Sequence, residues 1–246
     1  MKDWNERNDA NIKYIFFDCM ETLVDMVELP TSRDYAYWTY EGSGVEQYWL
    51  DKEEYWLQYK KAQEELLACY DVNEDYEICH RIRLTVENNT RIDRERKDIV
   101  AQKLYRNYWN NYRAKCYVNP DKKQALKELS QEYQLAVVSN FKVKEGIQEL
   151  LESHDIREFF DFVIVSVDCG WRKPDKRIYE EAMKLAGCNE EEILFVGDDY
   201  ENDYVIPRKL GMKAVYYDVG EKYRDCDTFS NFLSLKERIK TLGIGN

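Results

Sequence analysis

The chain has few of the residues that mark zinc-binding or disulfide-stabilised proteins. Only two histidines occur among its 246 residues, which excludes a site built from several histidines. The seven cysteines are odd in number and form no C-x-x-C pair. We therefore expect reduced thiols rather than a disulfide framework or a structural zinc site.

Basic charge and long apolar runs are also scarce. With 36 basic and 48 acidic residues the net charge is −12, which excludes the broad basic surface of a general nucleic-acid or anionic-membrane binder. Apolar runs such as Phe162–Val167 are far shorter than the ~20 residues of a membrane span. Because Met1–Ala10 is polar and charged, we expect no secretory signal and a cytoplasmic protein.

What the chain does contain is a series of short apolar runs, each followed by polar residues. Runs of this length, rich in Val, Ile, Phe and Tyr, are typical of strands buried on both faces of a parallel sheet. Helical patterns separate the later runs, and this alternation predicts an α/β fold with a doubly wound parallel sheet. The predicted strands are Tyr14–Phe17, Leu135–Val138, Phe162–Val167, Ile193–Val196 and Lys213–Tyr217, and the predicted helices are Asp121–Gln131, Lys144–Ser153, Asp175–Ala186, Asn202–Leu210 and Leu233–Leu242.

The segment from Leu29 to Cys116 has a different pattern. It contains no comparable strand run and is rich in Trp, Tyr, Glu and Arg at helical spacing. A connection between parallel strands needs only about a dozen residues, so a segment this long predicts a separate helical subdomain. We assign residues 29–116 to this subdomain, and residues 1–28 and 117–246 to the α/β core.

Polar side chains follow the predicted strands where a parallel sheet places its ligand-binding crevice. Carboxylates clustered in such a crevice repel one another unless a cation joins them, and oxygen ligands suit Mg²⁺. A lysine and a hydroxyl beside that ion can hold phosphate oxygens, so the combination indicates phosphoryl transfer. The side chains are Asp18, Ser139, Asn140, Lys173, Asp198, Asp199 and Asp203.

In this order the residues resemble the four motifs of the haloacid dehalogenase (HAD) superfamily of hydrolases, most of which are phosphatases. The first motif of that family, D-x-D-G-T-L, corresponds to Phe16–Leu23, and the others correspond to Val138–Asn140, Arg172–Asp175 and Val196–Asp203. The segment 29–116 stands where subfamily I members carry a helical cap. The resemblance therefore implies a Rossmann-like core with an α-helical cap, and Mg²⁺-dependent hydrolysis of a small phosphorylated metabolite.

The resemblance also implies a role for each matching residue. Asp18 would be the nucleophile that forms an aspartyl-phosphate, and Lys173 would neutralise developing charge and orient Asp18. Thr22 and Ser139 would bind phosphate oxygens, and Asn140 would shape the floor of the pocket. The implied Mg²⁺ ligands are Asp18, the backbone carbonyl of Met20, Asp198 and Asp203.

The chain departs from the phosphatase pattern at two positions of the first motif. Family phosphatases have a second Asp where this chain has Met20, and that Asp protonates the leaving alcohol and then activates water. Methionine can do neither, and such acid–base help is typically worth ~10²–10⁴ in rate. Glu21 replaces the usual glycine, so its side chain either points away from the site or restricts the turn.

Three functional interpretations remain open. The first is a phosphohydrolase whose substrate has a good leaving group, or which borrows an acid such as Glu21, His80 or a cap carboxylate. The second is a non-phosphatase member, either a dehalogenase or a phosphonatase; the carboxylate cluster around Asp198 argues against the metal-free dehalogenases. The third is a catalytically weakened binding protein. Asp199 is expected either to support the site or to form a turn.

Overall fold

A six-stranded parallel sheet forms the centre of the computed structural model, which describes residues 12–220, 222–223 and 226–241. The strand order is β5-β4-β1-β6-β7-β8, and β1 pairs in parallel with both β4 and β6. This arrangement confirms the predicted α/β class. The strands are β1 (Tyr14–Phe17), β4 (Gln134–Ser139), β5 (Phe162–Val165), β6 (Ile193–Gly197), β7 (Lys213–Tyr217) and β8 (Thr228–Phe229).

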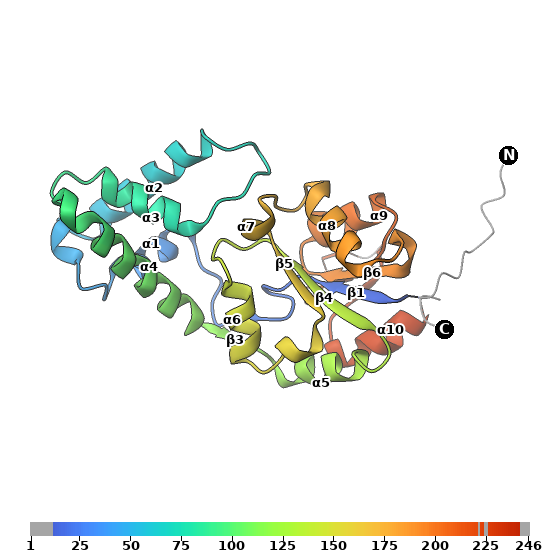
Figure 1. Cartoon of the computed structure of the whole chain (residues 1–246). Helices are drawn as coiled ribbons and strands as arrows, with labels where there is room; N and C mark the ends of the chain where they lie inside the picture. Colours follow the sequence, from blue (N-terminus) through green and yellow to red (C-terminus); the bar gives the residue numbers. More distant parts are fainter. Residues whose placement is uncertain (1–11, 221, 224–225, 242–246) are drawn as a thin grey trace.

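Helices cover both faces of the sheet, because successive strand residues point to opposite sides. Ile15 and Phe17 enter one core with α5, α6 and α10, whereas Tyr14 and Phe16 enter the other with α8. Figure 1 shows these helices on the two sides of the strands. Their bounds are α5 (Pro120–Leu129), α6 (Gly146–Ser153), α7 (Ser166–Cys169), α8 (Lys176–Ala186), α9 (Ile206–Lys209) and α10 (Leu235–Thr241).

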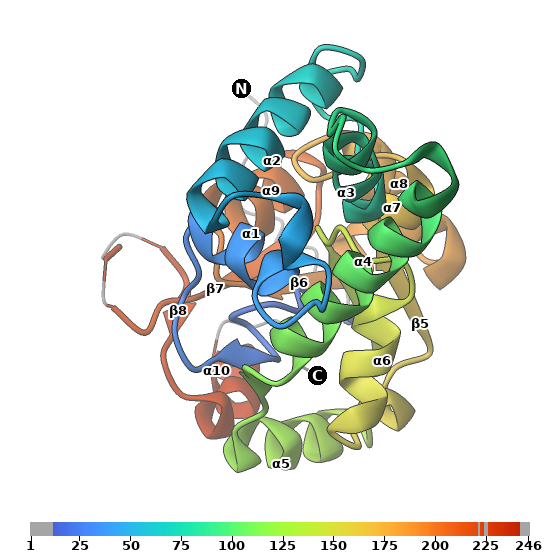
Figure 2. The ribbon, with the colours of Figure 1, turned by 90° about the vertical axis from the view of Figure 1, so that its left-hand side faces the viewer.

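The segment between β2 and β3 contains the four helices α1 to α4, which pack on one another beyond one end of the sheet (Figure 1). Viewed after a 90° turn, they stand in front of the sheet (Figure 2). The chain enters and leaves this segment through β2 and β3, which pair antiparallel. The elements are β2 (Asp25–Met26), α1 (Ser32–Tyr40), α2 (Lys52–Leu67), α3 (Ile78–Glu87), α4 (Lys97–Arg113) and β3 (Cys116–Tyr117).

The loop between α2 and α3 extends from this helical segment toward α7 (Figure 1). Asp75 N donates to Gly170 O at 2.9 Å, and Arg172 N donates to Asn73 O at 2.9 Å. These backbone hydrogen bonds attach the helical segment to the loop that follows α7.

Two predicted elements differ from the structure. The apolar run Phe162–Val167 is strand only to Val165, and then forms the short helix α7, which ends at Gly170 with a φ of 82°. The predicted helix Asn202–Leu210 begins as a π-helical turn at Tyr200 and becomes α-helical at Ile206. The first difference arises because the hydrophobicity of a short run does not distinguish helix from strand, whereas the second is a change in the type of helix within a segment that is helical as predicted.

Boundary differences elsewhere are small. The predicted helix at Leu233–Leu242 is observed as α10, and Leu242 lies outside the described residues. The polar segment Met1–Ala10 also lies outside them. None of the helices in the described ranges is long and apolar enough to cross a membrane.

Candidate active site

Asp18 lies directly after β1, at the carboxyl end of the sheet. Its backbone N–H donates to Val196 O at 2.9 Å, which continues the pairing of β1 with β6 for one residue. Its side chain is buried, and Oδ1 accepts hydrogen bonds from Ser139 Oγ (3.2 Å) and Lys173 Nζ (2.7 Å). Residues from three separate parts of the chain therefore meet at one carboxylate oxygen.

Lys173 joins two buried carboxylates. Its Nζ lies 2.7 Å from Asp18 Oδ1 and 2.6 Å from Asp203 Oδ1, and the residue is only 2% exposed. Burial disfavours the charged form, but the carboxylates of Asp18 and Asp203 outweigh it and hold the pKa of Lys173 above its ordinary value. The lysine therefore stays cationic beside Asp18.

Asn140 fixes the backbone of this lysine. Its Nδ2 donates to Lys173 O at 2.9 Å, and Lys173 N donates to its Oδ1 at 2.7 Å. The paired bonds connect the end of β4 to the loop before α8. Asn140 thus positions Lys173 as well as lining the neighbouring cavity.

Asp198 and Asp203 complete an acidic cluster with Asp18. One carboxylate oxygen from each of the three lies within 4.8 Å of the others. Burial, together with the negative charge of Asp18, raises the pKa of Asp198, and burial raises the pKa of Asp203. The cluster therefore carries more negative charge than Lys173 alone balances.

The donor set of the cluster fits a hard divalent cation such as Mg²⁺, because every side-chain donor is an oxygen. Asp18 and Asp198 are the stronger candidates for direct ligands. Both oxygens of Asp203 are already bonded: Oδ1 to Lys173 Nζ and Oδ2 to the backbone N–H of Asp199 at 3.0 Å. Asp203 is thus better placed to hold Lys173 and the Asp198–Asp199 turn.

Thr22 and Asp199 support Asp198 and the turn around it. Thr22 is fully buried, and its Oγ1 donates to Asp198 Oδ1 at 3.0 Å. The Asp199 side chain accepts from Asn202 N (2.9 Å) and Nδ2 (2.8 Å) at the start of the π-helical turn. Of the two expectations for Asp199, the structure shows the turn contacts.

The turn after β1 shows where the two unusual residues lie. Glu21 has a φ of 61°, in the left-handed region that favours glycine. Its Oε1 accepts from Met26 N at 3.1 Å, so the carboxylate is directed to β2. Met20 is partly buried in the same turn and packs against the hydrophobic core.

His80, another suggested acid, contacts the Tyr70 hydroxyl at 3.3 Å.

A profile of haloacid dehalogenase-like hydrolases matches residues 49–217. The chain belongs to the haloacid dehalogenase-like hydrolase family. Haloacid dehalogenase-like hydrolase domain-containing protein 3 from Bos taurus is 36% identical over 121 residues, covering 47% of this chain and 45% of that protein.

Other relatives of this HAD-family chain include a named phosphatase. Glyceraldehyde 3-phosphate phosphatase from Methanothermobacter thermautotrophicus is 35% identical over 86 residues, 35% of this chain and 38% of that protein. The chain spans about half or less of the length of these curated relatives. The crystal structure of 2-haloacid dehalogenase from Pseudomonas syringae has a TM-score of 0.75 and 19% identity, covering 94% of this chain and 99% of that one. At this identity the structural likeness establishes the fold.

This HAD-family chain also has a polar cluster that the sequence analysis missed. Asp75, in the loop before α3, pairs with Lys142 and accepts from Ser166 Oγ at 2.5 Å and Tyr76 N at 3.1 Å. Lys142 comes two residues after Asn140, and this position near a strand end was the available signal. Asp75 had none, because it lies in an acidic loop without periodicity.

A cavity of about 290 Å³ lies beside this cluster. Its lining comes from both the helical segment and the loops at the carboxyl end of the sheet. Asn140 and Arg172 belong to the lining and contact or adjoin Lys173. The cavity therefore neighbours the Asp18 site.

Proposed function

We propose that this chain is a Mg²⁺-dependent phosphohydrolase that uses Asp18 as its nucleophile. The observation that carries the proposal is the pair of contacts of Lys173, which holds Asp18 on one side and Asp203 on the other. A buried lysine at the nucleophile balances the charge of a bound phosphate and fixes the attacking oxygen. The partial similarity to glyceraldehyde 3-phosphate phosphatase supports a small phosphorylated metabolite as substrate.

The proposed reaction has two displacements. An oxygen of Asp18 forms a bond to phosphorus as the ester P–O bond breaks, and the leaving alkoxide takes a proton from water or an acidic group. Water then attacks the aspartyl-phosphate, releasing inorganic phosphate and a proton and restoring the carboxylate. Lys173 and the Ser139 hydroxyl hold phosphate oxygens through both steps, as donors preorganised beside Asp18.

The divalent cation would be held by Asp18, Asp198 and the backbone carbonyl of Met20. Bound there, it would neutralise phosphate charge and align the phosphoryl group with Asp18. Thr22 orients Asp198 through its hydroxyl, and Asp203 holds Lys173. In this proposal Thr22 acts on the metal ligand, in addition to the phosphate contact that the sequence analysis expected.

We assign residues 29–116 to a cap over this site, and residues 1–28 and 117–246 to the core. The shared cavity supports the assignment, because both the helical segment and the core line it. The antiparallel pair β2–β3 is the narrow connection about which such a cap would move. Closure would exclude water from the phosphate, as lids do in other enzymes.

A dehalogenase is the second candidate, and the observation that favours it is the methionine at position 20, Met20, where a proton-donating Asp would otherwise stand. Attack by Asp18 on carbon expels a halide, which needs no proton, so Met20 is not a handicap in that reaction. Against it, the acidic cluster of Asp18, Asp198 and Asp203 would have only Lys173 to balance its charge.

One assay distinguishes the candidates. The purified chain is tested on phosphorylated metabolites, an activated aryl phosphate and 2-haloacids, each with Mg²⁺ and with chelator. Phosphate release that requires the metal and disappears in Asp18→Asn supports the phosphohydrolase. Halide release that persists in chelator supports the dehalogenase. Absence of any turnover in a folded, Mg²⁺-binding protein would contradict both and favour a binding protein.

A further inference from the structure

We propose that the cavity lined by Arg81, Lys142 and Arg172 binds a second anionic group of the substrate. The preferred substrates are then small phosphate monoesters that also carry a carboxylate or another phosphate. The inference rests on the proposed function, because it describes the part of the substrate that projects away from Asp18.

The charge of the cavity lining is the first argument. Arg81, Lys142 and Arg172 supply its basic groups, and Asp75 is the acidic side chain among the described lining residues. Burial lowers the pKa of Lys142, and the positive charges of Arg172 and Arg81 act in the same direction. Arg81 and Arg172 therefore lie close enough to Lys142 to repel it, although the Asp75 carboxylate acts on it in the opposite direction and the chain as a whole carries a charge of −12. An anion in the cavity would relieve this repulsion.

Arg81 gives the second argument, because it is a buried cation that has no counter-ion among the described residues. It is 5% exposed, its Nε donates to Tyr59 O at 3.0 Å, and its guanidinium lies 3.6 Å from the centre of the Tyr59 ring. Its Nη2 is buried without a hydrogen-bond partner in the described structure. A buried charge is costly unless it is paired. A ligand carboxylate or phosphate accepts two parallel N–H bonds from a guanidinium.

The other two cations differ in their partners. Asp75 neutralises Lys142, and that carboxylate is itself held by the Ser166 hydroxyl. Arg172 is exposed and makes no ion pair with any of the described residues. The cavity therefore keeps two positive charges, those of Arg81 and Arg172, for a ligand.

The position of the cavity relates it to the reaction. Asn140 lines it and binds the backbone of Lys173, and Arg172 is the neighbour of Lys173 in the chain. A volume of about 290 Å³ lies at the small end of the range for ligand pockets. The site thus suits a molecule of a few carbon atoms with its phosphate at Asp18 and its second anion at Arg81.

Three substrates with one carbon skeleton test the charge requirement. They are glycerol 3-phosphate, 3-phosphoglycerate and glycerol 1,3-bisphosphate, which differ at C1 by a hydroxymethyl, a carboxylate or a phosphate ester. Two of these substrates, 3-phosphoglycerate and glycerol 1,3-bisphosphate, carry an anionic group at each end. We expect kcat/KM for at least one of them to exceed that for glycerol 3-phosphate by about tenfold or more, the usual effect of one charge-assisted contact. The substrate with the higher kcat/KM of these two shows whether the cavity prefers a carboxylate or a phosphate. Equal values for all three would overturn the inference.

Two variants and one control assign the selectivity to the cavity. Arg81→Met and Arg172→Gln are each expected to bring the ratio of kcat/KM between the preferred anionic substrate and glycerol 3-phosphate toward one, mainly through KM. Arg83→Gln is the control, because Arg83 lies on the same helix but its exposed side chain faces Asp98 at 3.8 Å. If Arg81→Met fails to fold, the Arg172→Gln variant still tests the inference, because Arg172 is exposed and its replacement should leave the fold intact. An unchanged ratio in both variants would contradict the inference.

A binding measurement separates this inference from the proposed function. The Asp18→Asn protein is titrated calorimetrically with 3-phosphoglycerate and glycerol 1,3-bisphosphate, alone and with the Arg81→Met or Arg172→Gln change added. Binding that weakens about tenfold or more in both double variants supports the anion site even if no substrate is turned over. Turnover of neutral-ended phosphate esters without any such binding would leave the phosphohydrolase standing and reject the anion site.

Discussion

At the scale of single residues, Gly197 shows how closely the site is packed. A Cβ at this position would lie 2.3 Å from Asp203 Oδ2, closer than real Cβ atoms approach an oxygen. Asp203 would have to move, and with it the carboxylate that holds Lys173. The glycine is therefore required by close approach rather than by backbone conformation.

We accordingly predict that Gly197→Ala lowers turnover by about tenfold or more and destabilises the fold by about 1–3 kcal/mol, the range for overpacking. Steady-state kinetics and urea unfolding measure the two effects. Gly220→Ala is the matched control, since its nearest neighbour is the flexible end of the Lys222 side chain at 3.3 Å. Wild-type activity in Gly197→Ala would show that the position of Asp203 is not needed.

Met20 provides a second prediction at this scale. If a missing proton donor limits the phosphohydrolase, Met20→Asp should raise kcat for ordinary phosphomonoesters by about tenfold or more, within the usual range for general acid–base help. Met20→Asn is the control, because it has a similar size and polarity but no titratable proton. A folded Met20→Asp protein that binds Mg²⁺ and gains nothing over Met20→Asn would reject this explanation.

At the scale of elements, the sequence predicted those that have a strong local pattern. Strands β1, β4, β6 and β7 are continuous buried runs, and a chain segment buried on both faces has that pattern. The two-residue strands β2, β3 and β8 were missed, because two residues cannot show a period. Their pairing depends on tertiary contacts, such as β7 beside β8.

The polar residues at and beside the site also divide into those that the sequence predicted and those that it did not. The structure brings together Asp18, Ser139, Lys173, Asp198 and Asp203, which follow strands or lie in motifs and were therefore predictable. The Asp75 cluster was not predictable, since Asp75 is separated along the sequence by 67 residues from Lys142 and by 91 residues from Ser166, both of which it contacts. Such contacts depend on how the helical segment packs on the core.

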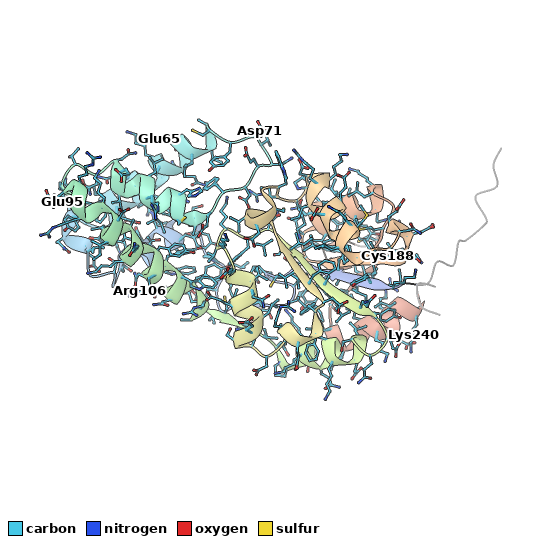
Figure 3. The ribbon with its side chains drawn as sticks, viewed as in Figure 1. Glu65, Asp71, Glu95, Arg106, Cys188 and Lys240 are labelled. Atoms are coloured by element: carbon cyan, nitrogen blue, oxygen red, sulfur yellow. The ribbon has the colours of Figure 1, made fainter. Side chains whose placement is uncertain are left out.

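Asp75 gives the prediction for this loop. Asp75→Ala removes the acceptor of Lys142, Ser166 and Tyr76 N, so we expect a loss of about 2–3 kcal/mol in unfolding free energy. Asp71→Ala is the control in the same loop, where Figure 3 shows Asp71 at the outer end, and it should change stability by less than about 0.5 kcal/mol. Equal effects in urea unfolding would show that the cluster does not hold the loop.

At the scale of the whole molecule, charge is distributed unevenly. The chain carries −12 overall, its acidic cluster lies at the ends of β1 and β6, and its cationic cavity lies between the helical segment and the core. A substrate that carries a phosphate and a second anion would need a bound cation at the acidic cluster, where its phosphate would lie. It would need none in the cavity, which already holds positive charge. The dependence of stability on pH and metal should therefore originate at the acidic cluster.

The sign of that dependence follows from Asp198. Burial, with the charge of Asp18, raises its pKa from 3.8 to about 7. Between these values the folded state holds a proton that the unfolded chain has lost, so this group favours folding less as pH rises from about 4 to about 7. A divalent cation can replace that proton only when the carboxylate is ionised. Mg²⁺ should therefore stabilise the protein little at about pH 5 and most at about pH 8.

Thermal unfolding with Mg²⁺ and with chelator measures this difference. At a concentration of about 100 times Kd the cation should add about 2.7 kcal/mol, which corresponds to a rise in Tm of roughly 5–10 °C for a chain of this size. Asp198→Asn should remove most of the Mg²⁺-dependent shift at both pH values, because it deletes a ligand and its titration together. A shift that is equal at about pH 5 and about pH 8, or that survives in Asp198→Asn, would place the cation away from Asp18 and Asp198.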